Sequence, residues 1–284
     1  MQRTLKNKVE IEGIGLHSGC SVKLVLKPAP ENSGIIFKRV DIPSSPEIKA
    51  VYTNVVDTRN CTCLGDAQGN LVSTIEHLMS ALSVCGIDNL LIETDNQEIP
   101  IMDGSAQPFY DILSRQELQI QNAPKKILRV KKQVEYTDEQ GNKVSLSPTT
   151  EDKLHIYFGI EFPSPIVGSQ VFDNDITPEI YASQIAPCRT FCEKYQVDYL
   201  KSIGLIKGGS LDNAVVLDGD KVLNDGGFRV KHECVNHKVL DALGDLYTAG
   251  QTIYGRYHAD KTGHRHNNEL LKILFADSSN YQIG

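Results

Sequence analysis

The residues with the clearest chemical spacing lie between positions 233 and 249. His237, Asp241 and Asp245 recur there every four residues, and residues four apart in a helix lie one turn apart on the same face. An imidazole and a carboxylate arranged in this way could chelate a divalent metal. The same spacing also occurs on solvated polar faces, where Lys238 would be ordinary surface charge, and an isolated H-x-x-x-D pair more often has that meaning.

Another sector of the same predicted helix is apolar. Five residues fall within about 100° of arc, which predicts that they pack in a core. They are Val235, Val239, Ala242, Leu243 and Leu246. The helix must therefore lie against the body of the protein.

Glu76 and His77 are adjacent at the start of a helix predicted over residues 74–85. His77 could supply a third metal ligand, and Glu76 could take a proton from an attacking water. Ser73 and Glu76 also have the S-x-x-E spacing of a capping box, in which the glutamate has no catalytic purpose. A helix N-terminus disfavours a protonated imidazole, so His77 should be neutral, but it could equally be a hydrogen-bonded structural histidine.

A further candidate is His264, the first residue of a helix predicted over 264–276. Such a histidine could serve as an acid, although the sequence alone gives no reason to favour it over His266. Thr190 places a hydroxyl after a proline-bearing loop. The segment 61–63, Cys-Thr-Cys, is more typical of two buried thiols on a strand than of a zinc knuckle.

The elements that would position these residues mix strands with helices. Helices are predicted at 74–85, 108–114, 193–203, 233–249 and 264–276, and strands within 4–37 and at 89–93, 154–162, 214–217 and 221–223. A hairpin should turn at 139–142. Both halves lack strict βαβ alternation, which is typical of an α+β protein.

A break in the pattern indicates the domain organisation. Between residues 116 and 126 the periodicity fails and the sequence becomes polar and includes a proline. We therefore expect an N-terminal domain over residues 1–122 and a C-terminal domain over residues 127–284.

Composition excludes several classes of protein. The net charge of −7 offers no basic field to a nucleic acid. No stretch approaches the ~20 apolar residues that span a bilayer, and no secretory apolar block opens the chain, so we expect a cytoplasmic protein without an integral membrane segment. The seven cysteines, an odd number in a chain of this length, favour reduced thiols over a disulfide framework.

Eight short motifs follow one another over nearly the whole chain. They lie at residues 13–19, 58–64, 73–78, 99–106, 186–191, 208–213, 237–245 and 263–267. Any one would be a loose pattern, but together they resemble the motifs of the UDP-3-O-acyl-N-acetylglucosamine deacetylases. The resemblance implies a zinc-dependent hydrolase that removes acetate from UDP-3-O-[(3R)-3-hydroxyacyl]-N-acetylglucosamine, leaving the free 2-amine, in the committed step of lipid A biosynthesis of Gram-negative bacteria.

The resemblance also implies a fold and a set of residue roles. The fold would be two similar α+β domains, each a small sheet packed with two helices, with the helices facing inward, an insert in each domain and the active site at the junction. The matching positions would make His77, His237 and Asp241 the ligands of one Zn²⁺ per chain. Glu76 would be the general base, His264 the general acid or electrostatic partner, and Asp245 the carboxylate that orients His264.

Other matching positions would bind the substrate. Thr190 would help to hold the developing oxyanion, and Lys238 would bind the substrate. Phe191 and Cys61 would line the pocket. The helix around Val197, Leu200 and Ile203 would form the passage for the acyl chain.

The expected partner is therefore a small UDP-acyl-sugar substrate, with no nucleic acid, and we expect a monomer. One alternative is a metal-free sugar-nucleotide-binding or regulatory protein of the same fold, against which the intact Glu76, His77, His237, Asp241 and His264 argue. The other is a zinc amidase that acts on peptides. The absence of an H-E-x-x-H helix argues against it.

Overall fold

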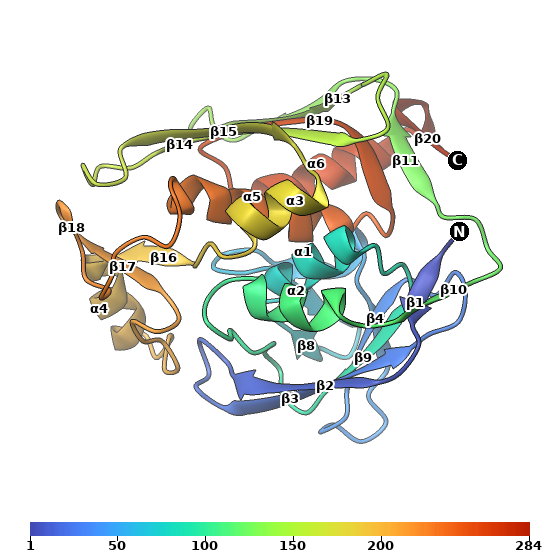
Figure 1. Cartoon of the computed structure of the whole chain (residues 1–284), viewed down its shortest axis with the longest axis horizontal. Helices are drawn as coiled ribbons and strands as arrows, with labels where there is room; N and C mark the ends of the chain where they lie inside the picture. The colour runs from blue at the N-terminus through green and yellow to red at the C-terminus, as the bar shows by residue number, and fades with distance from the viewer.

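The computed structural model describes residues 1–284 and contains two main β-sheets with helices between them (Figure 1). The first sheet has five strands and the second has seven. This is the mixed arrangement of strands and helices that the sequence predicts for an α+β protein. No helix is both long enough and apolar enough to cross a membrane.

The first sheet is built from the N-terminal half of the chain. Strand β3, Ser21–Pro28, shows why these residues form strands, because Val22, Leu24 and Leu26 are buried and alternate with more exposed residues. The strand order is β2-β3-β9-β4-β5, in which only β4 and β9 run parallel. The bounds are β2 Val9–Ile14, β3 Ser21–Pro28, β4 Ile35–Arg39, β5 Glu47–Lys49 and β9 Leu90–Thr94, with helices α1 Glu76–Cys85 and α2 Gln107–Ser114.

The second sheet is organised around β19, which pairs with β11, β13 and β14. The predicted hairpin at 139–142 is confirmed by the antiparallel pair β12 and β13. The bounds are β11 Ile127–Val130, β12 Val134–Thr137, β13 Lys143–Ser147, β14 Leu154–Glu161, β15 Ser169–Asp175, β19 Thr252–Asp260 and β20 Tyr281–Ile283, with helices α3 Pro178–Ile180, α5 Glu233–Tyr247 and α6 His264–Ala276.

Two small three-stranded sheets lie outside the main ones. One joins β6 Val55–Asp57, β7 Cys63–Gly65 and β8 Leu71–Val72. The other joins β16 Phe191–Glu193, β17 Val215–Asp218 and β18 Lys221–Val222, and carries α4 Lys194–Ser202. Figure 1 shows the second small sheet and α4 together at one end of the molecule.

Helices α1 and α5 pack closely in the layer between the main sheets (Figure 1). A Cβ atom at Gly244 would lie only 2.0 Å from the main-chain oxygen of Glu76, so the absence of a side chain permits this approach. The predicted core face of α5 is confirmed. Its polar face is buried as well, since His237, Asp241 and Asp245 are 2%, 5% and 3% exposed, and the alternative of a solvated face is therefore wrong.

The capping box predicted at the start of α1 is wrong. The helix begins at Glu76, and the preceding Ile75 makes no side-chain capping bond. Thr74 has a left-handed backbone, with φ of 60°, and Ser73 forms a β-bridge with Glu98. Ser73 is thus held outside the helix, and the Glu76 carboxylate is free for another role.

A short strand lies in the polar segment after α2, where β10 Leu118–Ile120 pairs with β1 Arg3–Leu5. A strand of three residues is too short to show periodicity. The expectation of two buried thiols on one strand needs correction. Cys63 begins β7, but Cys61 precedes that strand, so the two thiols do not share it.

Candidate metal centre and catalytic site

Three side chains that are far apart in the sequence converge where α1 meets α5. His77 lies in the first turn of α1, and His237 and Asp241 lie one turn apart on α5. The Nε2 atoms of His77 and His237 are 3.6 and 3.4 Å from Oδ1 of Asp241. Candidate ligand atoms of all three buried residues lie within 4.8 Å of one another.

A divalent ion fits this donor set. Tetrahedral zinc with ligand bonds of about 2.0–2.2 Å separates neighbouring ligand atoms by about 3.3–3.6 Å, which matches both nitrogen–oxygen distances. Two imidazoles and one carboxylate leave one position open, as catalytic zinc sites require. Burial lowers the pKa of His237 to about 3, so this imidazole is neutral and can offer a lone pair.

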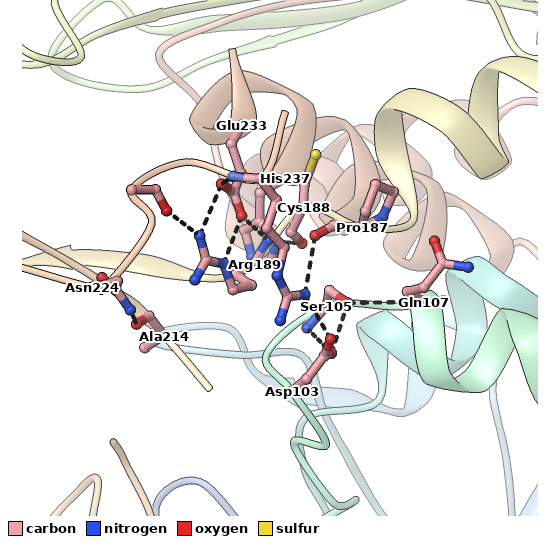
Figure 2. Close-up of polar contacts among 12 residues, drawn as sticks. Asp103, Ser105, Gln107, Pro187, Cys188, Arg189, Ala214, Asn224, Glu233 and His237 are labelled. Atoms are coloured by element: carbon pink, nitrogen blue, oxygen red, sulfur yellow. Dashed lines mark hydrogen bonds and ion pairs between the residues drawn. The ribbon is translucent and has the colours of Figure 1, made fainter. Parts of the chain in front are cut away.

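The orientation of His237 is fixed by a hydrogen bond on its other nitrogen. Nδ1 lies 3.0 Å from the main-chain oxygen of Cys188 (Figure 2). A carbonyl oxygen only accepts, so Nδ1 carries the proton and the lone pair is on Nε2, the atom that faces Asp241. This is the tautomer that a metal ligand needs.

Glu76 is buried beside this cluster. Its Oε2 atom accepts a hydrogen bond of 3.0 Å from the main-chain N–H of Thr62. Burial raises the pKa of the Glu76 carboxyl, although the positive charge of His264 opposes the shift. A carboxylate whose pKa is raised in this way is better matched to accepting a proton near neutral pH.

His264 begins α6, and its Nδ1 atom lies 2.8 Å from Oδ2 of Asp245 on α5. Asp245 also accepts hydrogen bonds from the Thr62 hydroxyl at 2.5 Å and from the Asn267 amide at 2.8 Å. Burial alone would lower the pKa of His264, but the charge and hydrogen bond of Asp245, together with the charge of Glu76, raise it to about 10. His264 is therefore a cation at neutral pH.

A cavity of about 580 Å³ adjoins the cluster, and Thr190, Phe191 and Lys238 line it. The amine of Lys238 donates to Oδ2 of Asp241 at 2.9 Å. The Phe191 ring stands perpendicular to the His237 ring, with centroids 6.3 Å apart. The cavity is thus in contact with the metal-ligand residues through two of its own lining side chains.

Helix α4 forms another part of the cavity wall. Val197 and Leu200 line it, as the resemblance implies. Ile203, the residue after the helix, is half exposed and lies outside the lining, and Cys61 is also outside it. The structure therefore brings together all the expected metal-ligand and acid–base residues, but not every expected substrate contact.

The family model for UDP-3-O-acyl N-acetylglycosamine deacetylase matches residues 2–276 of the chain. The chain belongs to this family. Curated relatives named UDP-3-O-acyl-N-acetylglucosamine deacetylase include proteins of Pasteurella multocida (strain Pm70), 44% identical, and Actinobacillus pleuropneumoniae serotype 3 (strain JL03), 42% identical. Both matches cover 99% of this chain and 92% of the relative. The resemblance stated from the motifs is confirmed.

Three residues of this deacetylase-family chain lie at the site although their positions in the sequence indicated no role. Thr62 contacts both Glu76 and Asp245, and His17 lines the cavity with a buried Nδ1 atom that has no partner. Both belong to matched motifs, which was the available signal. Cys188 contributes through its main-chain oxygen, which no residue type could reveal.

Proposed function

We propose that this chain is a zinc-dependent hydrolase that removes acetate from the 2-acetamido group of UDP-3-O-[(3R)-3-hydroxyacyl]-N-acetylglucosamine in lipid A biosynthesis. The observation that carries the proposal is the convergence of His77, His237 and Asp241 beside Glu76 and His264. Membership of the deacetylase family supports the substrate class. The site supplies the ligands, base and acid that hydrolysis of an unstrained amide needs.

His77, His237 and Asp241 would hold one Zn²⁺ per chain. A zinc ion bound by them supplies a Lewis acid that polarises the amide oxygen and lowers the pKa of a water toward ~7. The neutral imidazole of His237 and the buried carboxylate of Asp241 suit this role without a change of protonation.

Glu76 and His264 divide the proton transfers in this proposal. The Glu76 carboxylate, held by the Thr62 N–H, takes a proton from the attacking water. The cationic His264, held by Asp245, stabilises the negative charge that develops and donates a proton to the departing amine nitrogen. Each such group typically contributes about 10² to 10⁴ in rate.

The substrate would occupy the cavity beside the site. The Thr190 hydroxyl would help to hold the oxyanion, on a loop whose position is set by the hydrogen bond from the Thr190 N–H to the Gly104 oxygen at 2.8 Å. Although burial opposes its charge, Asp241 raises the pKa of Lys238, so a cation faces the cavity for the diphosphate-bearing substrate. Phe191, Val197 and Leu200 offer apolar surface for the acyl chain.

We also propose the finer organisation that the resemblance implies. Residues 1–122 and 127–284 would be two similar domains, a division supported by two separate clusters of buried hydrophobic residues. The small sheets around β7 and β17 would be their inserts. One chain supplies every residue of the site, which is consistent with a monomer, and seven unpaired cysteines are consistent with the cytoplasm.

Acetate release tests this function directly. The protein is stripped with a chelator, reloaded with Zn²⁺, and assayed on the acylated UDP-sugar and on an acetylated peptide. We expect about one zinc per chain and activity only on the sugar nucleotide with zinc present. Full activity of the stripped protein would refute the metal mechanism, release from the peptide would indicate an amidase, and tight binding of the sugar nucleotide without acetate release would indicate a binding protein.

A further inference from the structure

The peptide unit between Cys188 and Arg189 is hydrogen-bonded to side chains of α5 through both its C=O and its N–H (Figure 2). Its carbonyl oxygen accepts the 3.0 Å hydrogen bond from Nδ1 of His237, and its N–H donates to Oε1 of Glu233 at 3.0 Å. Glu233 and His237 are four residues apart, so they lie one turn apart on the same face of the helix. Because the C=O and N–H of a trans peptide point in opposite directions, fixing one of them fixes the direction of the other.

The Glu233 carboxylate is itself rigidly held. It is 1% exposed, and the guanidinium of Arg189, 5% exposed, binds it in a bidentate manner through Nε at 2.8 Å and Nη2 at 3.2 Å. The main-chain N–H of Arg229 donates to its Oε2 atom at 2.6 Å. Any displacement of this carboxylate would leave a buried cation unpaired, which is strongly unfavourable.

The loop that carries Cys188 has other anchors that do not involve Glu233. The N–H of Cys188 donates to the Ile185 oxygen at 3.0 Å, and the N–H of Thr190 donates to the Gly104 oxygen at 2.8 Å. These bonds hold the loop in place but do not set the direction of the Cys188 carbonyl. Glu233 is the side chain whose contact does so.

We propose that Glu233 is a positioning residue for the metal ligand His237. It orients the Cys188 carbonyl, which keeps the proton of His237 on Nδ1 and leaves the Nε2 lone pair directed toward Asp241. The inference rests on the proposed metal site and concerns metal affinity, not proton transfer. Groups that orient a ligating histidine in this way typically contribute about 10–100-fold to metal affinity.

The test measures zinc affinity and the His237 tautomer in three full-length variants. Glu233→Met removes both acceptor oxygens at similar volume, and Glu233→Gln keeps one. Asp88→Asn is the matched control, since Asp88 also accepts a main-chain N–H, from Arg3 at 2.8 Å, and pairs with a cation, Lys125, at 2.6 Å, away from the site. Zinc dissociation constants come from competition with a chelator, and nitrogen NMR of the zinc-free proteins reports the tautomer.

We expect Glu233→Met to bind zinc about 10–100-fold more weakly and to lose the Nδ1–H signature of His237, with Glu233→Gln between it and the wild type. Asp88→Asn should keep the wild-type affinity and tautomer even if it lowers the melting temperature. Wild-type affinity and tautomer in Glu233→Met would overturn the inference, and if that variant does not fold, the same result in Glu233→Gln would do so. A wild-type protein that binds no zinc would instead refute the proposed metal site, and this inference with it.

Discussion

The Nδ1 atom of His264 and the Oδ2 atom of Asp245 lie 2.8 Å apart across the contact between α6 and α5. Asp245 follows the candidate ligand Asp241 by one helical turn, so a single helix orients both the metal-binding and the proton-donating sides of the site. The hydroxyl of Thr62 fixes the second oxygen of Asp245. The cation at His264 is therefore a consequence of how α5 and α6 pack.

Asp245→Asn should move the basic limb of the pH–rate profile to lower pH. Against the effect of burial, Asp245 and the charge of Glu76 raise the pKa of His264 to about 10, so removal of the Asp245 charge lowers that pKa. In Asp245→Asn the protonated form of His264 is therefore lost at a lower pH than in the wild type. Profiles of kcat/KM between pH 6 and 10 measure the shift. An unchanged basic limb would remove His264 from proton donation.

The same pKa shift predicts how stability depends on pH. His264 has a higher pKa in the folded protein than in the unfolded chain, so its contribution to the free energy of unfolding is fully present below about pH 6.5 and is lost as pH rises through about 10. In Asp245→Asn the free energy of unfolding should lose much less of this His264 contribution between pH 6.5 and pH 10. Denaturation in urea at pH 6 and pH 10 for the metal-free proteins gives the comparison.

Glu76→Gln should lower turnover by at least about 10² while zinc content stays at the wild-type level. Glutamine keeps an acceptor oxygen for the Thr62 N–H but cannot take a proton from water. Glu93→Gln is the control, because Glu93 lies on β9 and pairs with Lys27, away from the site. Near-normal turnover in Glu76→Gln would leave that residue with a structural role only.

The sequence predicted the clustering of the candidate metal-ligand residues better than it predicted the lining of the cavity, for a physical reason. His237, Asp241 and Asp245 have helical spacing, which is a local property, and their common face could be predicted without any knowledge of packing. That this face is buried was not predictable, because burial comes from α1 crossing α5 at Gly244. From the spacing alone, a solvated polar face was therefore the more common interpretation.

The capping box shows how a local pattern can mislead. Ser73 and Glu76 have the correct spacing, but the bridge between Ser73 and Glu98, 25 residues away, removes the serine from the helix start. Long-range strand pairing overrode the local preference. The role of Cys188 was hidden for a different reason, since its contact with His237 is made by main-chain atoms.

Gly244→Ala should destabilise the protein and disturb the metal site. The new Cβ would lie 2.0 Å from the main-chain oxygen of Glu76, next to His77, and this oxygen belongs to a helix backbone that cannot rotate away. Overpacking of this kind typically costs about 1–3 kcal/mol. We expect a lower melting temperature together with weaker zinc binding. A melting temperature equal to that of the wild type would show that α1 and α5 can separate freely.

Leu200→Trp should raise the KM for substrates with a long acyl chain. Leu200 lines the cavity from α4, and the larger ring would occupy space that the acyl chain needs. kcat should change little, because α4 carries none of the proposed metal or acid–base groups. Ile203→Trp is the matched control, since Ile203 directly follows the same helix but lies outside the cavity lining and is half exposed. Initial rates on long- and short-acyl substrates give the KM of each variant for each acyl length. If Leu200→Trp and Ile203→Trp raise KM equally, or if both acyl lengths respond alike, the acyl chain does not bind in this cavity.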